Sequence, residues 1–253
     1  MIKFFRKIRQ RLLTNNKFSK YLIYAIGEII LVVIGILIAL QINNWNQNKI
    51  LKIEEVKSLK ALHSEFQENL HIFDSIFELH LIRNDAISKI LFSDVSNYSL
   101  SSLDSLYIEA NFNWTSNPSF SIYNSLINSG KIQLIANDTL KNKISQFKEH
   151  VNDYLEDEFY IFNFAAQFTM EHFVNDETML VESKFGLRVR NEIETLHDKD
   201  NYLKEFKSPK YRNRLSIVLL NGKPLISRGI GLRKEMMSLI EMIESEIDKL
   251  SKG

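Results

Sequence analysis

The chain has 253 residues, of which 45% are hydrophobic, and its 32 Lys and Arg nearly balance its 31 Asp and Glu. The absence of cysteine excludes a disulfide framework, thiolate zinc or iron–sulfur ligation and a cysteine nucleophile. A net charge of +1 gives no case for a nucleic-acid partner. The low Gly and Pro content, 8 and 3 residues, argues against a disordered chain or a loop-rich all-β fold.

The first twenty residues carry seven Lys and Arg and no acidic residue, and an apolar run follows them. From Tyr21 to Ile42 the only strongly polar side chains are Glu28 and Gln41, and a helix of this length spans roughly 33 Å, enough to cross a bilayer core. A buried core helix or a cleaved signal peptide fits less well, because the run is long, apolar all round and lacks a small-residue cleavage site. We therefore predict a transmembrane helix over residues 21–43. Aromatic anchors are expected at its two membrane interfaces, namely Tyr21, Tyr24 and Trp45.

Two stretches of the sequence are distinctive. The first covers residues 1–46 and contains the run GEIILVVIGILIALQINNWN, which begins at Gly27. The second contains Tyr123, Leu126, Ser129, Gly130, Leu134, Ile135, Asn137 and Leu140. Together they resemble a family of single-pass membrane proteins of unknown function from Bacteroidota, especially flavobacteria. The resemblance implies a membrane-anchored extracytoplasmic domain, and it carries over no known activity.

The charge bias predicts the orientation of the chain. Basic residues ahead of a membrane helix favour the cytoplasm, so the rest of the chain is expected on the periplasmic side of the inner membrane. The predicted parts are a basic cytoplasmic or interfacial segment at 1–20, the transmembrane helix at 21–43 and an extracytoplasmic helical domain at 44–253. The basic segment is expected to lie on the anionic leaflet, a solvated tail being the alternative. Its lipid-binding residues would be Lys3, Arg6, Lys7, Arg9 and Arg11.

One ionisable side chain lies inside the apolar run. Glu28 is costly to place there, so it is expected to face protein, water or a partner. Gly35 and Ala39 follow on nearly the same helix face, and small residues allow another helix to approach closely. We predict that these three residues form a contact face for a partner protein or a second copy of the chain. The alternatives are that Glu28 carries a proton, reaches the headgroups or simply stays protonated.

The sequence after Trp45 predicts an all-α fold. Apolar residues from Leu59 to Leu81 repeat with a mean step of about 3.7 residues, which gives a helix one apolar face. No Pro or Gly occurs from residue 36 to 117, so this helix can continue directly from the membrane segment. Residues 93–121 predict a short helix within an irregular connection that ends near Pro118.

Local signals mark the next two helices. One is predicted over Ser121–Asn128 and ends at Ser129 and Gly130, where glycine suits a left-handed backbone. Asn137 is expected to cap a helix from Asp138 to about Phe173. The apolar face of this helix would contain Ile144, Phe147, Val151, Leu155, Phe159, Phe162 and Ala166. The acidic residues Asp153, Glu156, Asp157 and Glu158 are expected on its outside.

The C-terminal part predicts two more helices. The first begins at Ser208 and Pro209 and ends near Gly222, and the second follows Pro224. Residues 175–207 are mixed and charged, and strand-like runs are too few to form a sheet. One transmembrane helix followed by four or more helices with short turns predicts an antiparallel helical bundle outside the membrane.

No motif for catalysis or cofactor binding is recognisable. None of the six histidines forms a metal-ligand pair, and the acidic run near Glu158 lacks the spacing of a calcium loop. The sequence contains no nucleophile elbow and no phosphate-binding loop. We therefore predict an interaction or scaffold component, with no enzymatic activity and no cofactor. The alternatives are a ligand-sensing domain that acts through a partner and a proton-coupled, stator-like subunit that uses Glu28.

Overall fold

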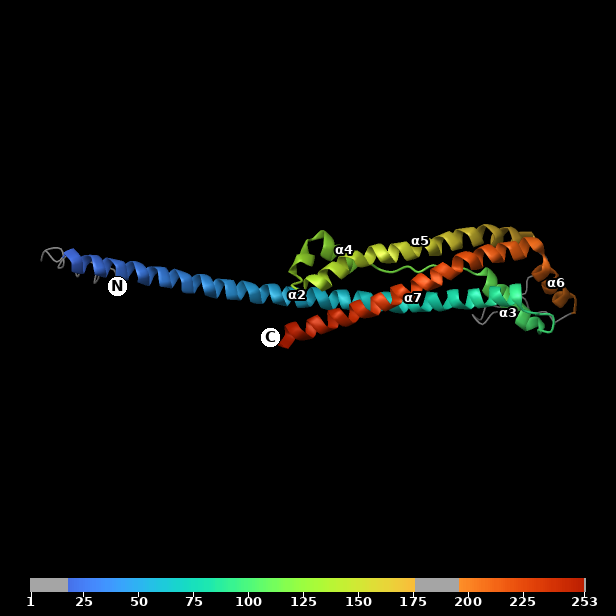
Figure 1. The fold of residues 1–253 in the computed structure, drawn as a ribbon, viewed down its shortest axis with the longest axis horizontal. Helices are drawn as coiled ribbons and strands as arrows, with labels where there is room; N and C mark the ends of the chain where they lie inside the picture. Colours follow the sequence, from blue (N-terminus) through green and yellow to red (C-terminus); the bar gives the residue numbers. More distant parts are fainter. Residues whose placement is uncertain (1–17, 176–195, 253) are drawn as a thin grey trace. The chain divides into compact units, whose positions relative to one another are not determined.

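The computed structural model describes residues 18–175 and 196–252 (Figure 1). All regular structure in these two ranges is helical, which confirms the predicted all-α class. The elements are α2 (Phe18–Phe92), α3 (Leu100–Asn111), α4 (Ser121–Asn128), the 3₁₀ helix η1 (Lys131–Leu134), α5 (Asp138–Asn175), α6 (Leu196–Lys207) and α7 (Pro209–Lys252).

Helix α2 is uninterrupted, as the absence of Pro and Gly after residue 35 predicts. The chain nevertheless divides within it into two compact units, residues 1–55 and residues 56–253. In the first unit the large aliphatic side chains between Leu22 and Ile42 are about half exposed. In the second unit α2 buries most of the predicted apolar face, including Leu59, Leu62, Phe66, Phe73 and Phe77. The last residue of that predicted face, Leu81, is 37% exposed, so the prediction is wrong there.

Within residues 56–253, α5 runs in the same direction as α2. The ring of Phe66 lies 4.7 Å from that of Phe147, and the ring of Phe73 lies 5.2 Å from that of Tyr154. Both helices therefore advance by seven residues between these contacts. A short turn, as in the predicted antiparallel bundle, cannot join two parallel helices. The chain between α2 and α5 therefore includes a longer return path, which Figure 1 shows as a thin extended trace.

The return path is an extended stretch, residues 112–120, which we call the return segment. It follows α3 and precedes α4, so the predicted short helix within an irregular connection is confirmed. An extended chain between helices has no neighbouring strand with which to form backbone hydrogen bonds. Its buried N–H and C=O groups therefore need side-chain partners. This requirement explains several of the buried polar residues described below.

Helix α7 runs against α2 and packs along α5. The guanidinium of Arg233 binds the carboxylate of Asp74 at 2.8 Å, and further along both helices Gly222 lies against Asn84. The predicted break between residues 221 and 224 is wrong, because α7 continues through it with Pro224 inside the helix. Gly222 serves close helix contact instead, since a Cβ there would lie 2.6 Å from the Asn84 side-chain oxygen.

The predicted ends of α4 and α5 are confirmed. Helix α4 spans the predicted residues, and Gly130 behind it has φ 71°, a left-handed conformation that favours glycine. Asn137 caps α5, because its side-chain oxygen accepts a hydrogen bond from the Leu140 backbone N–H at 3.1 Å.

The predicted apolar face of α5 is correct only in its first half. Phe159 is 49% exposed and Phe162 is 37% exposed. From Val151 onward the buried positions step alternately by three and four residues. The predicted positions take two consecutive steps of four, to Leu155 and Phe159, and so move to the exposed side of the helix. The side chains buried in their place are Tyr154, Glu158, Ile161 and Ala165.

Candidate functional site

The apolar half of α2 contains the predicted membrane span. From Ala25 onward it includes a window with a mean hydropathy of 2.6, none of which is buried within the molecule. It is the one helix in the described residues that is long and apolar enough to cross a membrane, by length and composition. Exposed aliphatic side chains in this number have no favourable place in water.

The predicted contact face lies on this helix. Gly35 and Ala39 are exposed, and a Cβ added to Gly35 would meet nothing within 4 Å. Glu28 is half-buried. At 100° per residue the three positions fall within about 40° of one another around the helix, so one surface presents them all.

Trp45, the predicted anchor at the far interface, is 66% exposed. The ammonium group of Lys49 lies 5.7 Å from the centre of its ring, within cation–π distance. The remaining predicted membrane contacts lie outside the described residues or side chains. They are Tyr21, Tyr24, Lys3, Arg6, Lys7, Arg9 and Arg11.

The second unit contains a buried polar cluster that the sequence analysis did not predict. It joins α2, the return segment and α5, and each of its side chains is at most 7% exposed. Its members are His80, Arg83, Ser116, Tyr154 and Glu158. The predicted position of Glu158 on the outside of its helix is wrong, because this residue is 1% exposed.

Glu158 is the centre of the buried polar cluster. One carboxylate oxygen accepts hydrogen bonds from the Ser116 hydroxyl at 2.8 Å and from His80 Nε2 at 3.0 Å. The other accepts the Ser116 backbone N–H at 2.6 Å. Because an ionised carboxylate can only accept, Nε2 is the protonated nitrogen of the His80 ring.

Arg83 provides the opposite charge in the cluster. Its Nη1 donates to the Asn113 side-chain oxygen at 3.0 Å, and burial lowers its pKa to about 10, so it stays protonated at neutral pH. Burial also lowers the pKa of His80, although the hydrogen bond to Glu158 opposes this shift. A neutral His80 leaves one cation and one anion, which is the balanced state expected for an interior site.

Ser116, His80 and Glu158 are the residue types of a hydrolase triad, but their arrangement is different. In a triad the histidine lies between the hydroxyl and the carboxylate, whereas here the carboxylate joins the other two. The cluster is also closed to solvent. In this arrangement the Glu158 carboxylate satisfies polar groups of the return segment.

A second set of contacts holds the other end of the return segment. Asn69 on α2 donates to the Ser119 carbonyl at 2.7 Å and accepts the Ser119 N–H at 2.8 Å. The Glu65 carboxylate accepts the backbone N–H groups of Ile122 and Tyr123, each at 2.8 Å. A carboxylate at the first turn of α4 also complements the positive end of the helix dipole.

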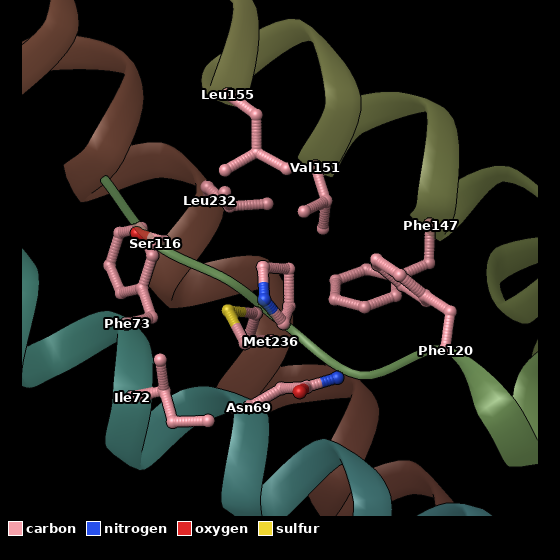
Figure 2. A pocket seen from close by; sticks show the side chains of 11 residues that line it. Asn69, Ile72, Phe73, Ser116, Phe120, Phe147, Val151, Leu155, Leu232 and Met236 are labelled. Carbon is pink, nitrogen blue, oxygen red and sulfur yellow. The ribbon is translucent and has the colours of Figure 1, made fainter. Parts of the chain in front are cut away.

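The space between these contacts is closely filled. Figure 2 shows a small apolar pocket around the return segment, with Phe73 from α2, Val151 from α5 and Met236 from α7 among its lining residues. Its cavity of about 10 Å³ is comparable to a single water molecule's probe sphere. The pocket is too small for a substrate or cofactor.

An open groove on the α5–α7 surface is lined by charged and titratable side chains, among them His150, Arg228 and Glu235. His150 Nδ1 lies 2.8 Å from Glu235, and Arg228 binds Asp157 at 2.6 Å. In the described ranges no three His, Asp or Glu side chains are placed to hold a metal ion together. Both pairs link α5 to α7.

A family model matches residues 28–184, more than half of the chain. The chain belongs to DUF6090, a family of unknown function. The DUF6090 match begins at Glu28 and extends beyond α5, so it includes residues of both units. No curated protein and no solved structure matches the chain significantly.

Proposed function

We propose that this protein is a single-pass anchor of the inner membrane, with a cytoplasmic N-terminus and a periplasmic helical domain that acts as an interaction or scaffold component. The observation that carries the proposal is the unburied apolar half of α2, because each Ile or Leu side chain gains about 1.5–3 kcal/mol when it leaves water completely. The basic residues before it support the orientation.

Alkaline extraction of membranes tests the anchor. The full chain is expected to stay in the membrane pellet and to leave it only with detergent. The double variant Ile34→Asp, Leu37→Asp is expected to move into the soluble fraction, because each carboxylate at the helix centre costs about 2.5–3.5 kcal/mol. A matched pair, Ser64→Asp and Ser75→Asp, lies at exposed positions of the same helix and should leave extraction unchanged. Release of the unmodified chain by alkali would overturn the proposal.

The domain's construction supports an interaction role over an enzymatic one. The buried carboxylate of Glu158 is hydrogen-bonded to the return segment, and the cavity nearby is too small for a substrate. Helices α5 and α7 pack along each other, and we propose that together with α2 they form a helical bundle whose outer surface binds partners. A ligand-sensing domain is the alternative, and it would need a partner to carry its signal.

The contact face supports a partner or a second copy within the membrane. The chain has no cysteine, so single substitutions give unambiguous crosslinks. Gly35→Cys and Ala39→Cys are expected to form disulfide-linked dimers in oxidised membranes if a second copy binds there. Leu37→Cys is the control, because it lies about 200° around the helix from Gly35. Equal crosslinking at all three positions would contradict the contact face.

Glu28 distinguishes contact from proton transport. Glu28→Gln keeps the hydrogen-bonding ability of the side chain and removes its charge, whereas Glu28→Ala removes both. Loss of assembly in the alanine variant alone supports a contact, and loss of the cellular phenotype in both variants, with assembly intact, favours a proton-coupled subunit. Unchanged assembly and phenotype in both variants would dispose of either role.

A further inference from the structure

The part of α2 just beyond Trp45 has an unusual surface for a helix in water. We call residues 45–53 the outer collar. Within it Ile50 is 50% exposed, Leu51 is 47% exposed and Ile53 is 60% exposed, and two lysines lie among them. The outer collar lies entirely in the first compact unit.

The position of the outer collar along the helix matches the headgroup layer of a bilayer. The uninterrupted apolar run, residues 29–40, is centred about 16 Å from Trp45 at about 1.5 Å per residue, which places this ring at the edge of the hydrocarbon. Lys49 lies about 22 Å from the same centre, at the outer edge of the headgroups. Lysine side chains are long enough to reach back from there to the lipid phosphates.

The arrangement around the helix axis distinguishes lipid from a protein partner. At 100° per residue the directions of Ile53, Ile50 and Leu51 spread over about 160°, and Trp45 and Lys49 point to the remaining side. One partner helix covers a single narrow stripe and leaves most of these side chains exposed. A headgroup layer surrounds the helix on every side, so it covers all of them.

The charges of the outer collar favour an anionic layer. Residues 44–53 contain Lys49 and Lys52 and no acidic residue. In the described part of the chain neither ammonium group has a carboxylate within ion-pair distance, and Lys49 instead lies over the Trp45 ring. The carboxylates that follow, Glu54 and Glu55, already have interactions of their own.

We propose that the outer collar binds the anionic phosphate headgroups of the lipid leaflet on the domain side, through Lys49 and Lys52 with Trp45 as the depth anchor. The proposal rests on the proposed membrane anchor and adds a lipid preference to it. Each lysine near an anionic surface contributes about a fivefold preference at low ionic strength.

Fluorescence quenching by brominated lipids tests this preference. The full chain carrying Trp114→Phe is placed in vesicles of phosphatidylcholine and phosphatidylglycerol, of which either one is brominated. Bromine quenches only nearby rings, so the signal reports on the lipids around Trp45 and not on those at the opposite interface. If the substituted chain fails to fold, the difference between the unmodified chain and Trp45→Phe gives the same signal.

The expected result is stronger quenching by brominated phosphatidylglycerol, with a preference of about fivefold per lysine that shrinks at high salt. Lys49→Gln with Lys52→Gln should abolish this preference, and Lys57→Gln with Lys60→Gln should leave it intact. Equal quenching by the two brominated lipids, or a preference that survives the first double variant, would overturn the inference and leave the membrane anchor standing. Quenching by neither lipid would overturn both, because Trp45 would then lie outside the bilayer.

Discussion

Two buried carboxylates determine how the second unit holds an extended chain among helices. Glu158 accepts hydrogen bonds from the backbone and side chain of Ser116, and Glu65 accepts those from the first turn of α4. A carboxylate is well suited to this task, because it can accept several hydrogen bonds and has no N–H or O–H group that would itself need an acceptor. The interior charges are therefore part of the fold's construction.

Removal of the Glu158 carboxylate should destabilise the domain strongly. Glu158→Ala leaves His80 and the Ser116 N–H without their hydrogen-bond acceptor and the Arg83 charge without the nearby negative charge, so the free energy of unfolding should fall by about 3–5 kcal/mol. Asp157→Ala is the neighbouring control, because its ion pair with Arg228 is partly exposed and worth about 0–1 kcal/mol. Denaturant unfolding of the full chain in detergent, followed by Trp114 fluorescence, measures both. Equal losses in the two variants would contradict the assigned role.

His80 should make the domain sensitive to mild acid. Burial and the nearby Arg83 hold the pKa of His80 below its ordinary value of 6.5, and the Glu158 hydrogen bond only partly offsets them. The unfolded chain therefore binds a proton at a higher pH than the folded one, so the free energy of unfolding should decrease as the pH falls below about 6.5. His80→Gln, which keeps a donor for Glu158, should flatten the profile between pH 7 and 5. An unchanged slope in this variant would refute the assignment.

The buried polar cluster shows where residue-level prediction fails. Acidic residues in a helix are nearly always solvated, so Glu158 was placed outside on sound general grounds. Its partner His80 lies 78 residues away in the sequence, and no local pattern links them. The available signal was that His80, Arg83 and Asn84 continue the apolar face of Phe73 and Phe77, whereas the exposed Leu81 does not.

At the scale of the elements, glycines in α7 allow it to approach α2. A Cβ at Gly222 would lie 2.6 Å from Asn84, and one at Gly229 would overlap the Phe77 ring. Gly222→Ala and Gly229→Ala should each lower the free energy of unfolding by about 1–3 kcal/mol through overpacking.

The same helix provides the control for this test. Gly231 is exposed, and an added Cβ there meets nothing within 4 Å. Gly231→Ala should raise the free energy of unfolding by up to about 1 kcal/mol, because alanine favours the helix. Thermal unfolding of the three variants, followed by circular dichroism, measures these changes in stability. Destabilisation by Gly231→Ala equal to that of the other two would contradict the packing role.

The ends of elements were predictable where local chemistry decides them. Gly130 behind α4 and Asn137 before α5 act through neighbouring backbone groups, and their effects were predicted correctly. Gly222 and Pro224 carry equally strong stop signals, yet α7 passes through them. Packing of Gly222 against Asn84 outweighs the local tendency of glycine and proline to end a helix, and no sequence pattern predicts that contact.

At the scale of the whole molecule, the two units differ in whether their apolar side chains are exposed or buried. Among the described residues, most apolar side chains of 22–55 are exposed, whereas those of the second unit fill a core that also contains paired charges. The composition of the membrane span made the first unit predictable. The path of the second unit was not predictable, because the partners of the return segment are distributed over Glu65, Asn69 and Glu158.

A topology measurement tests the central claim, that the chain crosses the membrane once with its helical domain outside the cytoplasm. Two single-cysteine variants of the cysteine-free chain, Thr14→Cys and Ser251→Cys, are exposed to a membrane-impermeant maleimide in spheroplasts before and after lysis. The account predicts labelling of Ser251→Cys in intact spheroplasts and of Thr14→Cys only after lysis. Labelling of Ser251→Cys only after lysis would place the domain in the cytoplasm and contradict the account.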